Sequence, residues 1–197
     1  MPVNPKYLAK FYPGNYYHVY NRSHSQKQMF LNHDNYVFFL QLLKKYLGHH
    51  LDFFAYCLLP NHFHLFVKAK DPDQNEQDIN LTISNQFRNM CIAYTNAYNI
   101  MHHMYGGIFE TPFRRIMVDD DNYFSSLVYY IHCNPQHHNM NIALSNYPYS
   151  SYASFLSNKL TLLQRKQVLD WFGGRNLFIK YHEMQKRNYM AGEFLIE

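Results

Sequence analysis

Cysteine and long apolar segments are both scarce in this chain of 197 residues. The three cysteines, Cys57, Cys91 and Cys133, are an odd number without Cys-x-x-Cys spacing, which argues against a disulfide framework and a cysteine-based zinc site. No apolar run approaches the roughly 18 residues that a membrane helix needs, and the N-terminus lacks the charged-then-apolar pattern of a secretion signal. We therefore expect a soluble, cytoplasmic protein without a membrane partner.

Charge is sparse as well, at 16% of residues, whereas hydrophobic residues make up 47%, so the chain can bury a substantial core and is not disordered. Lys and Arg total 18 against 14 Asp and Glu, and the net charge of +4 is far from that of a polybasic protein. Aromatic residues are abundant at 18%, enough for an aromatic core or for platforms that stack on bases or sugars. The length suits one domain with additions, because a typical domain has about 150 residues.

The order of the predicted elements indicates the fold class. Apolar periodicity predicts strands over 16–21, 51–59, 62–68 and 108–118, and helices over 32–47, 80–101 and 122–132, of which the second can be capped by Asn80. Pro60-Asn61 joins the second and third strands as an antiparallel hairpin. This β-α-β-β-α-β order is that of a split βαβ, ferredoxin-like sheet. We therefore predict an α+β fold, an antiparallel sheet with helices on one face, plus a C-terminal extension.

Two further local predictions can be checked against the structure. In the first helix, Asn32 and Gly48 flank a stripe that we expect to be buried: Val37, Leu40, Leu43 and Leu47. In the C-terminal part, weaker signals predict a loop at 146–152, a helix over 161–172 and a tail over 176–197.

His62-Phe63-His64 is the first short motif with chemical meaning. Residues i and i+2 of a strand point to the same face, so both imidazoles project together while Phe63, Leu65 and Val67 face the core. Two imidazoles close together on a rigid strand are a ready pair of metal ligands. The motif also arises by chance in a chain with 13 histidines. The adjacent histidine pairs are interpreted as surface residues rather than ligands: His49-His50, His102-His103 and His137-His138.

The second motif, Tyr129-Tyr130-Ile131-His132-Cys133-Asn134-Pro135, lies at the end of a predicted helix. At about 100° per residue, one apolar stripe of this helix faces the core: Phe124, Leu127, Val128 and Ile131. Tyr129 then points toward solvent, and Tyr130 lies on the flank, near the direction of Asn134. The residue before a proline disfavours helical geometry, so we expect the helix to end at Asn134. Taken alone, these residues fit a boundary aromatic and a helix cap better than a site.

Together, the two motifs resemble those of the single-tyrosine HUH transposases, and most closely those of the REP-associated tyrosine transposases. Five segments carry the resemblance. They are the opening strand (Gly14–Arg22), the metal-binding strand (Leu58–Leu65), the segment before the tyrosine helix (Phe109–Arg115), the nucleophile motif (Tyr130–Pro135) and a later signature (Pro148–Tyr152). The family often has a short basic stretch closed by Gly after its Asn-Pro. Here the stretch is Gln136-His137-His138-Asn139, and Asn tolerates the left-handed conformation that Gly would adopt.

The resemblance implies cleavage of single-stranded DNA by Tyr130, whose hydroxyl attacks a backbone phosphate to give a 5′-phosphotyrosine bond and a free 3′-hydroxyl. A tyrosine hydroxyl has a pKa of about 10, so it must lose its proton as it attacks. The resemblance also implies a divalent cation, Mg²⁺ or Mn²⁺, held by His62, His64 and the side-chain oxygen of Asn134, to polarise the phosphate. Ligand chemistry alone would also admit Zn²⁺ or Ni²⁺, because imidazole suits both.

The expected partner is a single-stranded DNA hairpin, bound by a monomer or a homodimer. The resemblance also implies a cytoplasmic protein that associates with the nucleoid while it acts. Residues 1–155 would form the HUH transposase-like catalytic domain, and residues 156–197 a C-terminal helical extension or tail of the same domain. Phosphate contacts are predicted at the cations nearest to the site along the sequence: Arg22, Lys68, Arg114 and Arg115.

Two other functions are compatible with parts of the sequence. A ferredoxin-like sheet also serves RNA-binding domains, so a non-catalytic nucleic-acid-binding module is one alternative. A metal-dependent hydrolase that uses activated water is another, and its cleavage would survive Tyr130→Phe. The joint presence of Tyr130, His62, His64 and Asn134 favours the tyrosine enzyme, because a binding module needs no such set.

Overall fold

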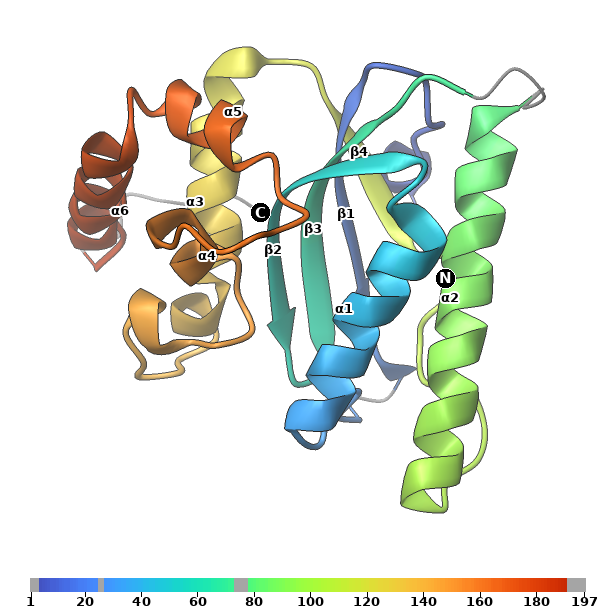
Figure 1. Cartoon of the computed structure of the whole chain (residues 1–197). Helices are drawn as coiled ribbons and strands as arrows, with labels where there is room; N and C mark the ends of the chain where they lie inside the picture. The colour runs from blue at the N-terminus through green and yellow to red at the C-terminus, as the bar shows by residue number, and fades with distance from the viewer. Residues whose placement is uncertain (1–3, 25–26, 73–77, 191–197) are drawn as a thin grey trace.

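The computed structural model describes residues 4–24, 27–72 and 78–190. Four strands form one antiparallel sheet in the spatial order β2-β3-β1-β4: β1 (Tyr16–Arg22), β2 (Leu51–Leu59), β3 (His62–Ala69) and β4 (Arg114–Val118). Helices α1 (His33–Leu47) and α2 (Ile79–His102) cover one face of the sheet, and α3 (Asp121–His137) lies on the other, against β2 and β3 (Figure 1). The predicted α+β, split βαβ architecture is confirmed, but the prediction of helices on one face is wrong, because α3 packs on the face opposite α1 and α2.

The chain after α3 forms short helical segments that lie beside that helix (Figure 1): η3 (Leu144–Asn146), α4 (Tyr152–Leu156), α5 (Arg165–Trp171) and α6 (Arg175–Met190). The predicted tail over 176–197 is therefore wrong up to residue 190, and its remainder, 191–197, lies outside the described residues. The predicted helix over 161–172 is confirmed only over its second half. Among the residues of α6 whose burial is described, 175–185, only Phe178 and His182 are buried, which explains why its apolar pattern is weak. None of the helices in the described residues has the length and apolar character needed to cross a membrane.

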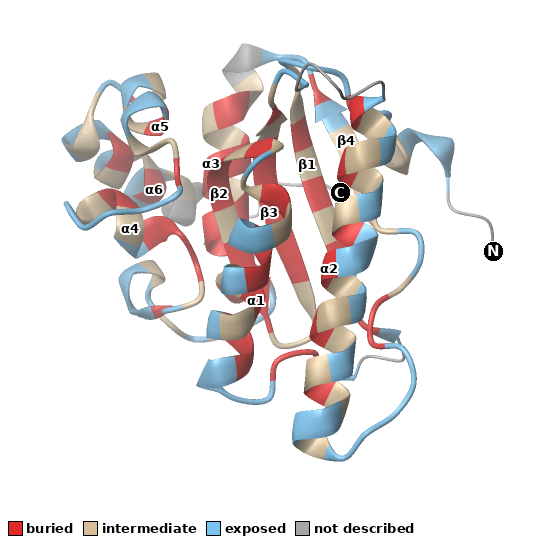
Figure 2. Ribbon diagram, turned by 45° about the vertical axis from the view of Figure 1, so that its right-hand side comes forward, coloured by how far each residue is buried: buried red, intermediate tan, exposed pale blue. Residues whose placement is uncertain are grey.

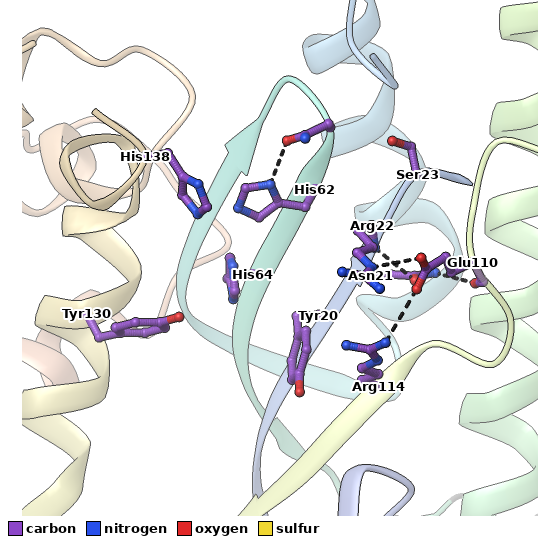
Figure 3. Close-up of a pocket in the computed structure, with 11 residues that line it drawn as sticks. Tyr20, Asn21, Arg22, Ser23, His62, His64, Glu110, Arg114, Tyr130 and His138 are labelled. Atoms are coloured by element: carbon purple, nitrogen blue, oxygen red, sulfur yellow. Dashed lines mark hydrogen bonds and ion pairs between the residues drawn. The ribbon is translucent and has the colours of Figure 1, made fainter. Parts of the chain in front are cut away.

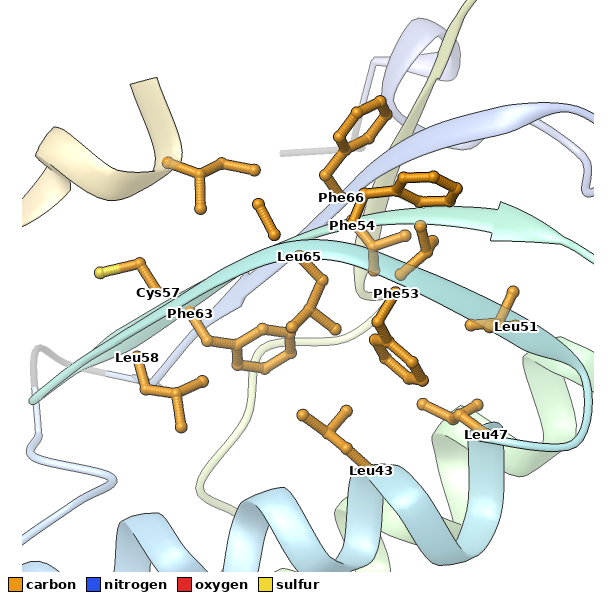
Figure 4. Packing of buried hydrophobic residues seen from close by; sticks show 14 of the residues in the cluster. Leu43, Leu47, Leu51, Phe53, Phe54, Cys57, Leu58, Phe63, Leu65 and Phe66 are labelled. Carbon is orange, nitrogen blue, oxygen red and sulfur yellow. The ribbon is translucent and has the colours of Figure 1, made fainter. Parts of the chain in front are cut away.

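Strand β3 alternates as its sequence predicts. Phe63, Leu65 and Val67 are fully buried and lie on the face covered by α1 and α2, where Phe63 packs near Leu43 of α1 (Figure 4). The strands and the inward faces of α1 and α2 hold much of the buried surface (Figure 2). The hairpin between β2 and β3 turns at Pro60-Asn61, as predicted.

Helix α1 has its predicted boundaries, with the Asn32 side chain accepting a hydrogen bond from the Asn35 N–H at 3.1 Å. Of the predicted buried stripe, Leu43 and Leu47 are buried, whereas Val37 is 38% exposed and Leu40 is half-buried. Tyr36 and Phe39 are buried in their place. The larger aromatic side chains bury more apolar area than Val37 would, so the helix turns them toward the sheet.

Helix α2 begins two residues earlier than the sequence predicts. Asp78 is its N-cap, and the carboxylate of Asp78 accepts a hydrogen bond from the Leu81 N–H at 3.0 Å. Asn80, the predicted cap, instead accepts a hydrogen bond from the Phe11 N–H at 3.0 Å and ties the N-terminal segment to the helix. Of the extended segment predicted over 108–118, only Arg114–Val118 is a strand.

Helix α3 does not end at Asn134, as predicted, but continues through Pro135 to His137. Proline removes one backbone donor, and the last turn still closes because the His138 N–H donates to the Asn134 carbonyl at 3.1 Å. The chain then leaves the helix through Asn139, whose φ of 58° is in the left-handed region. Asn139 therefore takes the conformation that was predicted for it.

Tyr129 does not point to solvent, as predicted, but is 2% exposed. Its ring centroid lies 6.2 Å from that of Tyr181 and 5.5 Å from that of His182, both on α6. The phasing of α3 is as predicted, since Phe124, Leu127, Val128 and Ile131 are buried. The error arose because α6 covers the side of α3 that faces away from the sheet.

Phe63→Ala should lower the free energy of unfolding by about 3–5 kcal/mol, because it leaves a cavity where the buried ring packs against Phe39 and Phe109. Val37→Ala, at the exposed position of α1, should change it by less than about 0.5 kcal/mol. Urea denaturation followed by circular dichroism measures both. A larger loss from Val37→Ala than from Phe63→Ala would contradict this assignment of the core.

Candidate functional site

A pocket of about 420 Å³ opens on the α3 side of the sheet, at the end where β3 begins and β1 ends. It is lined by residues of β1, β3, β4, α3 and the loops beside them (Figure 3): Tyr20, Asn21, Arg22, Ser23, Asn61, His62, His64, Glu110, Arg114, Tyr130 and His138. The pocket therefore contains both predicted histidines, the predicted tyrosine and two of the predicted arginines.

Strand register brings the sheet residues of the pocket together. Arg22 pairs with His62, and Tyr20 pairs with His64 on one side and with Arg114 on the other. Residues directly opposite in an antiparallel pair project to the same face, so all five side chains share the face that α3 covers.

Tyr130 approaches this face from α3. Its ring centroid is 5.8 Å from that of His64 and 5.9 Å from that of His18, each in an edge-on arrangement. Figure 3 shows the ring of Tyr130 extending from the helix toward the sheet below His64. The flank position predicted for Tyr130 thus places it beside the histidine pair.

Hydrogen bonds orient both imidazoles. His62 Nδ1 lies 2.7 Å from Asn61 Oδ1, and because an amide oxygen can only accept, Nδ1 carries the proton and Nε2 presents a lone pair. His64 Nδ1 lies 2.9 Å from His18 Nε2, so the histidine at 18 holds the ring of His64 from behind. A partner on the second ring nitrogen is typical of histidines that ligate metals.

Burial keeps these imidazoles neutral. It lowers the pKa of His62 and of His18 to about 4 each. Burial, reinforced by the neighbouring His18, also holds the pKa of His64 well below its usual range. Neutral imidazole is the form that binds a cation, so both side chains are in the ligating state at neutral pH.

Asn134 is not among the residues that line the pocket, but its side chain lies near His62 and would supply a third donor atom. Its side chain is buried, and its Nδ2 donates a hydrogen bond to the Tyr130 carbonyl at 3.0 Å. Asn134 Oδ1 and His62 Nε2 are both buried without a hydrogen-bond partner among the described residues, and proximity of the Asn134 amide partly offsets the lowering of the His62 pKa. Buried acceptors without partners cost about 1–3 kcal/mol each, which a bound cation would offset.

The donor set is therefore two imidazoles and one amide oxygen, which fits a divalent cation with open positions. In the described part of the chain, no three His, Cys, Asp or Glu side chains form a group that could hold a metal ion. A metal at this pocket would thus depend on the amide oxygen of Asn134.

Arg22 and Arg114 meet at Glu110. Arg22 Nε lies 2.7 Å from one carboxylate oxygen and Arg114 Nη2 lies 3.4 Å from the other (Figure 3). Two guanidinium groups against one carboxylate leave an excess positive charge at the rim. The Arg22 side chain is 60% exposed, so it can reach an anion in the pocket.

Arg115 and Lys68 are not brought to the pocket. Arg115 follows Arg114 on β4 and points to the opposite face, where its Nε donates to the Ala9 carbonyl at 2.5 Å and its guanidinium lies over the Phe113 ring. Lys68 shares the pocket face but is four residues beyond His64, with its ammonium 5.2 Å from the centroid of the Tyr16 ring.

Two comparisons with known proteins bear on the family. The chain is 26% identical over 128 residues to a REP-associated tyrosine transposase of Haemophilus influenzae, an alignment that covers 64% of this chain and 69% of that protein. Its fold matches the solved structure of a REP-associated tyrosine transposase bound to a REP hairpin, with a TM-score of 0.63 and 17% identity, over 82% of this chain and 88% of that one. The resemblance to the REP-associated tyrosine transposases is confirmed. No family model matches the chain.

The resemblance to the REP-associated tyrosine transposases did not reveal Glu110, His18 or His138 as parts of the site. His138, predicted to be a surface residue, is exposed, yet it lines the pocket with its ring centroid 4.5 Å from that of His62. It arrives there because α3 continues past Pro135. His18 could have been found by pairing β1 with β3, because it lies two residues before Tyr20 on the same face.

Acidification should destabilise the protein. Burial lowers the pKa of His182 to about 4 and that of His132 well below its usual range, while an unfolded histidine titrates near 6.5. Between about pH 6.5 and 4 the unfolded state therefore binds more protons, and stability, fully present above this window, is lost as pH falls.

We expect the free energy of unfolding, measured by urea denaturation in the presence of chelator, to fall by about 1 kcal/mol or more per pH unit below pH 6.5. His182→Gln removes one of these titrating groups, so its stability should fall less steeply. Identical slopes for the two proteins would contradict the assignment of His182 as neutral and buried.

Proposed function

We propose that this chain cleaves and rejoins single-stranded DNA beside a hairpin, as a transposase-like enzyme with Tyr130 as the nucleophile. The observation that carries the proposal is the convergence of Tyr130, the His62–His64 pair and the Arg22–Arg114 pair on one pocket. Its resemblance in sequence and fold to REP-associated tyrosine transposases, one of them solved with a REP hairpin, supports DNA as the substrate.

The pocket has two chemically different sides. On one side, His62, His64 and Asn134 offer lone pairs, which would hold a divalent cation such as Mg²⁺ or Mn²⁺. On the other side, Arg22 and Arg114 offer N–H donors suited to phosphate oxygens. When bound, the cation would polarise the phosphate and stabilise negative charge on its oxygens.

Tyr130 supplies the attacking atom. Its hydroxyl oxygen forms a bond to phosphorus as the bond from phosphorus to the 3′ oxygen breaks, and the proton lost from tyrosine is balanced by the one gained by the 3′-hydroxyl. The 5′-phosphotyrosine conserves the energy of the broken bond, so the 3′-hydroxyl of another strand can reverse the attack without ATP. Holding the phosphate against Tyr130 is the task of Arg22 and Arg114.

Tyr130→Phe should abolish cleavage of single-stranded hairpin DNA and leave DNA binding intact, because it removes one oxygen atom. Denaturing gels of the protein incubated with Mn²⁺ and a labelled pool of hairpins detect both the cut strand and the covalent adduct. Tyr20→Phe, which alters the other tyrosine of the pocket, and Tyr129→Phe, next to Tyr130 but turned toward α6, are the matched controls and should form the adduct normally.

The pattern of results separates the alternatives. Cleavage by Tyr130→Phe without an adduct would indicate a hydrolase that uses activated water. An adduct that disappears in Tyr20→Phe would move the nucleophile to β1. Binding of hairpins by the wild-type protein with no cleavage of any of them would indicate a non-catalytic binding module.

Arg114→Ala should weaken binding of hairpin DNA about tenfold, since it removes a charge-assisted contact to phosphate, and should reduce the salt dependence of binding. Arg115→Ala removes the same charge from the next position of β4 but on the opposite face. Its affinity, corrected for the folded fraction, should equal that of the wild type. Fluorescence anisotropy at several salt concentrations measures both, and equal losses would show that binding responds only to net charge.

A further inference from the structure

A chain of hydrogen bonds runs through the buried region behind α3 and plays no part in the pocket itself. His182 Nδ1 lies 2.8 Å from the Phe178 carbonyl, and His182 Nε2 lies 3.0 Å from His132 Nδ1. His132 Nε2 lies 2.8 Å from Ser151 Oγ, which accepts a hydrogen bond from the Tyr56 N–H at 2.9 Å. His132 and His182 are 1% exposed and Ser151 is 0% exposed.

A single arrangement of protons satisfies this chain. The Phe178 carbonyl can only accept, so His182 Nδ1 donates and His182 Nε2 accepts. His132 must then donate from Nδ1 and accept at Nε2, so the Ser151 hydroxyl donates to His132 at 2.8 Å rather than to the Tyr56 carbonyl at 3.2 Å. Each ring nitrogen then has one role, and the chain has a fixed direction from β2 through α3 to α6.

The chain connects α3 to the strand beside the histidine pair. Residues 149–151 lie along the edge of β2: the Leu58 N–H donates to the Tyr149 carbonyl and the Ser151 N–H to the Tyr56 carbonyl, both at 2.9 Å. The residue after Tyr56 is Cys57, which is in register with His64 on β3. The sheet edge next to His64 and the helix that carries Tyr130 are therefore joined by directional bonds.

His132 lies on α3 between the two site residues of this helix, two residues after Tyr130 and two before Asn134. Apolar side chains of α3, such as Leu127, Val128 and Ile131, are buried in the core as well. Apolar packing depends weakly on direction, whereas hydrogen bonds require alignment within tens of degrees. A rotation of α3 by one residue, about 100°, would carry Tyr130 out of the pocket.

We propose that Ser151, His132 and His182 are positioning residues that fix the rotation of α3 on the sheet and thereby aim Tyr130 and Asn134 at His62 and His64. The expected effect on cleavage rests on the proposed function, whereas the expected effect on the orientation of Tyr130 does not. It also gives a role to the segment Pro148–Tyr152, which the sequence singled out without indicating what it does: its serine at 151 connects the sheet edge to the nucleophile helix.

The test compares two substitutions at His182, which is remote from the pocket. His182→Gln keeps an acceptor for His132 Nδ1, because the Gln side-chain oxygen can take the place of Nε2. His182→Leu keeps the apolar bulk and removes the acceptor. Two readouts are measured below the melting temperature of each variant: single-turnover cleavage at saturating DNA and Mn²⁺, and nuclear Overhauser effects between the ring protons of Tyr130 and His64.

We expect His182→Leu to lose the Tyr130–His64 effect and to cleave about 10- to 100-fold more slowly at unchanged DNA affinity. His182→Gln should restore both. If His182→Leu does not fold, Ser151→Ala applies the same test from the other end of the chain.

Three results would be decisive. A folded His182→Leu protein with an intact Tyr130–His64 effect and the wild-type cleavage rate would overturn the inference and leave the proposed function standing. Equal loss in His182→Gln and His182→Leu would also overturn it, because the acceptor would then be irrelevant. Loss of the ring contact only in His182→Leu, with no cleavage by any protein including the wild type, would uphold the positioning role and overturn the proposed function.

Discussion

The alternation of side chains along β3 is the constraint on which the rest of the structure depends. His62 and His64 project to one face while Phe63, Leu65 and Val67 are buried on the other. A slip of one residue would exchange the two sets, burying the imidazoles under α1 and α2 and turning the apolar side chains toward α3 and the pocket. The apolar set therefore determines which face α1 and α2 cover, and it leaves the histidine face for α3.

The resulting pocket holds groups that attract a cation close to groups that attract an anion. Lone pairs of His62 and Asn134 are buried without hydrogen-bond partners in the part of the chain that the structure describes, while Arg22 and Arg114 present positive charge on the same face of the sheet. Glu110 holds the two arginines together and partly neutralises them. A metal ion with a phosphate group would satisfy both sides at once, because the cation faces the lone pairs and the anion faces the guanidinium groups.

Local sequence patterns predicted the parts of the site that lie on one element. The hairpin, the histidine face of β3 and the flank position of Tyr130 follow from the periods of strand and helix. What the sequence did not predict depends on contacts between distant segments. Tyr129 is buried by α6, and Asn80 is occupied by the backbone of Phe11 rather than capping α2.

Two further predictions from the sequence, the positions of the arginines and the end of α3, were also wrong in part. Proximity along the sequence grouped Arg114 with Arg115, although consecutive strand residues point to opposite faces. The Asn134-Pro135 pair predicts that α3 ends at Asn134, yet a proline near the last turn removes a single hydrogen bond. The helix continues to His137, and the next residue, His138, lines the pocket. The sequence did not predict α6, because few of its described side chains are buried and its apolar pattern is weak.

The most direct test of the account is the location of Mn²⁺ by anomalous diffraction from crystals of the full chain. We predict a single strong peak within coordination distance of His62 Nε2, His64 and Asn134 Oδ1, on the side of the pocket that faces Tyr130. A peak elsewhere, or Mn²⁺ bound by the histidines with the Asn134 oxygen turned away, would contradict the claim that strand β3 and helix α3 build one centre together.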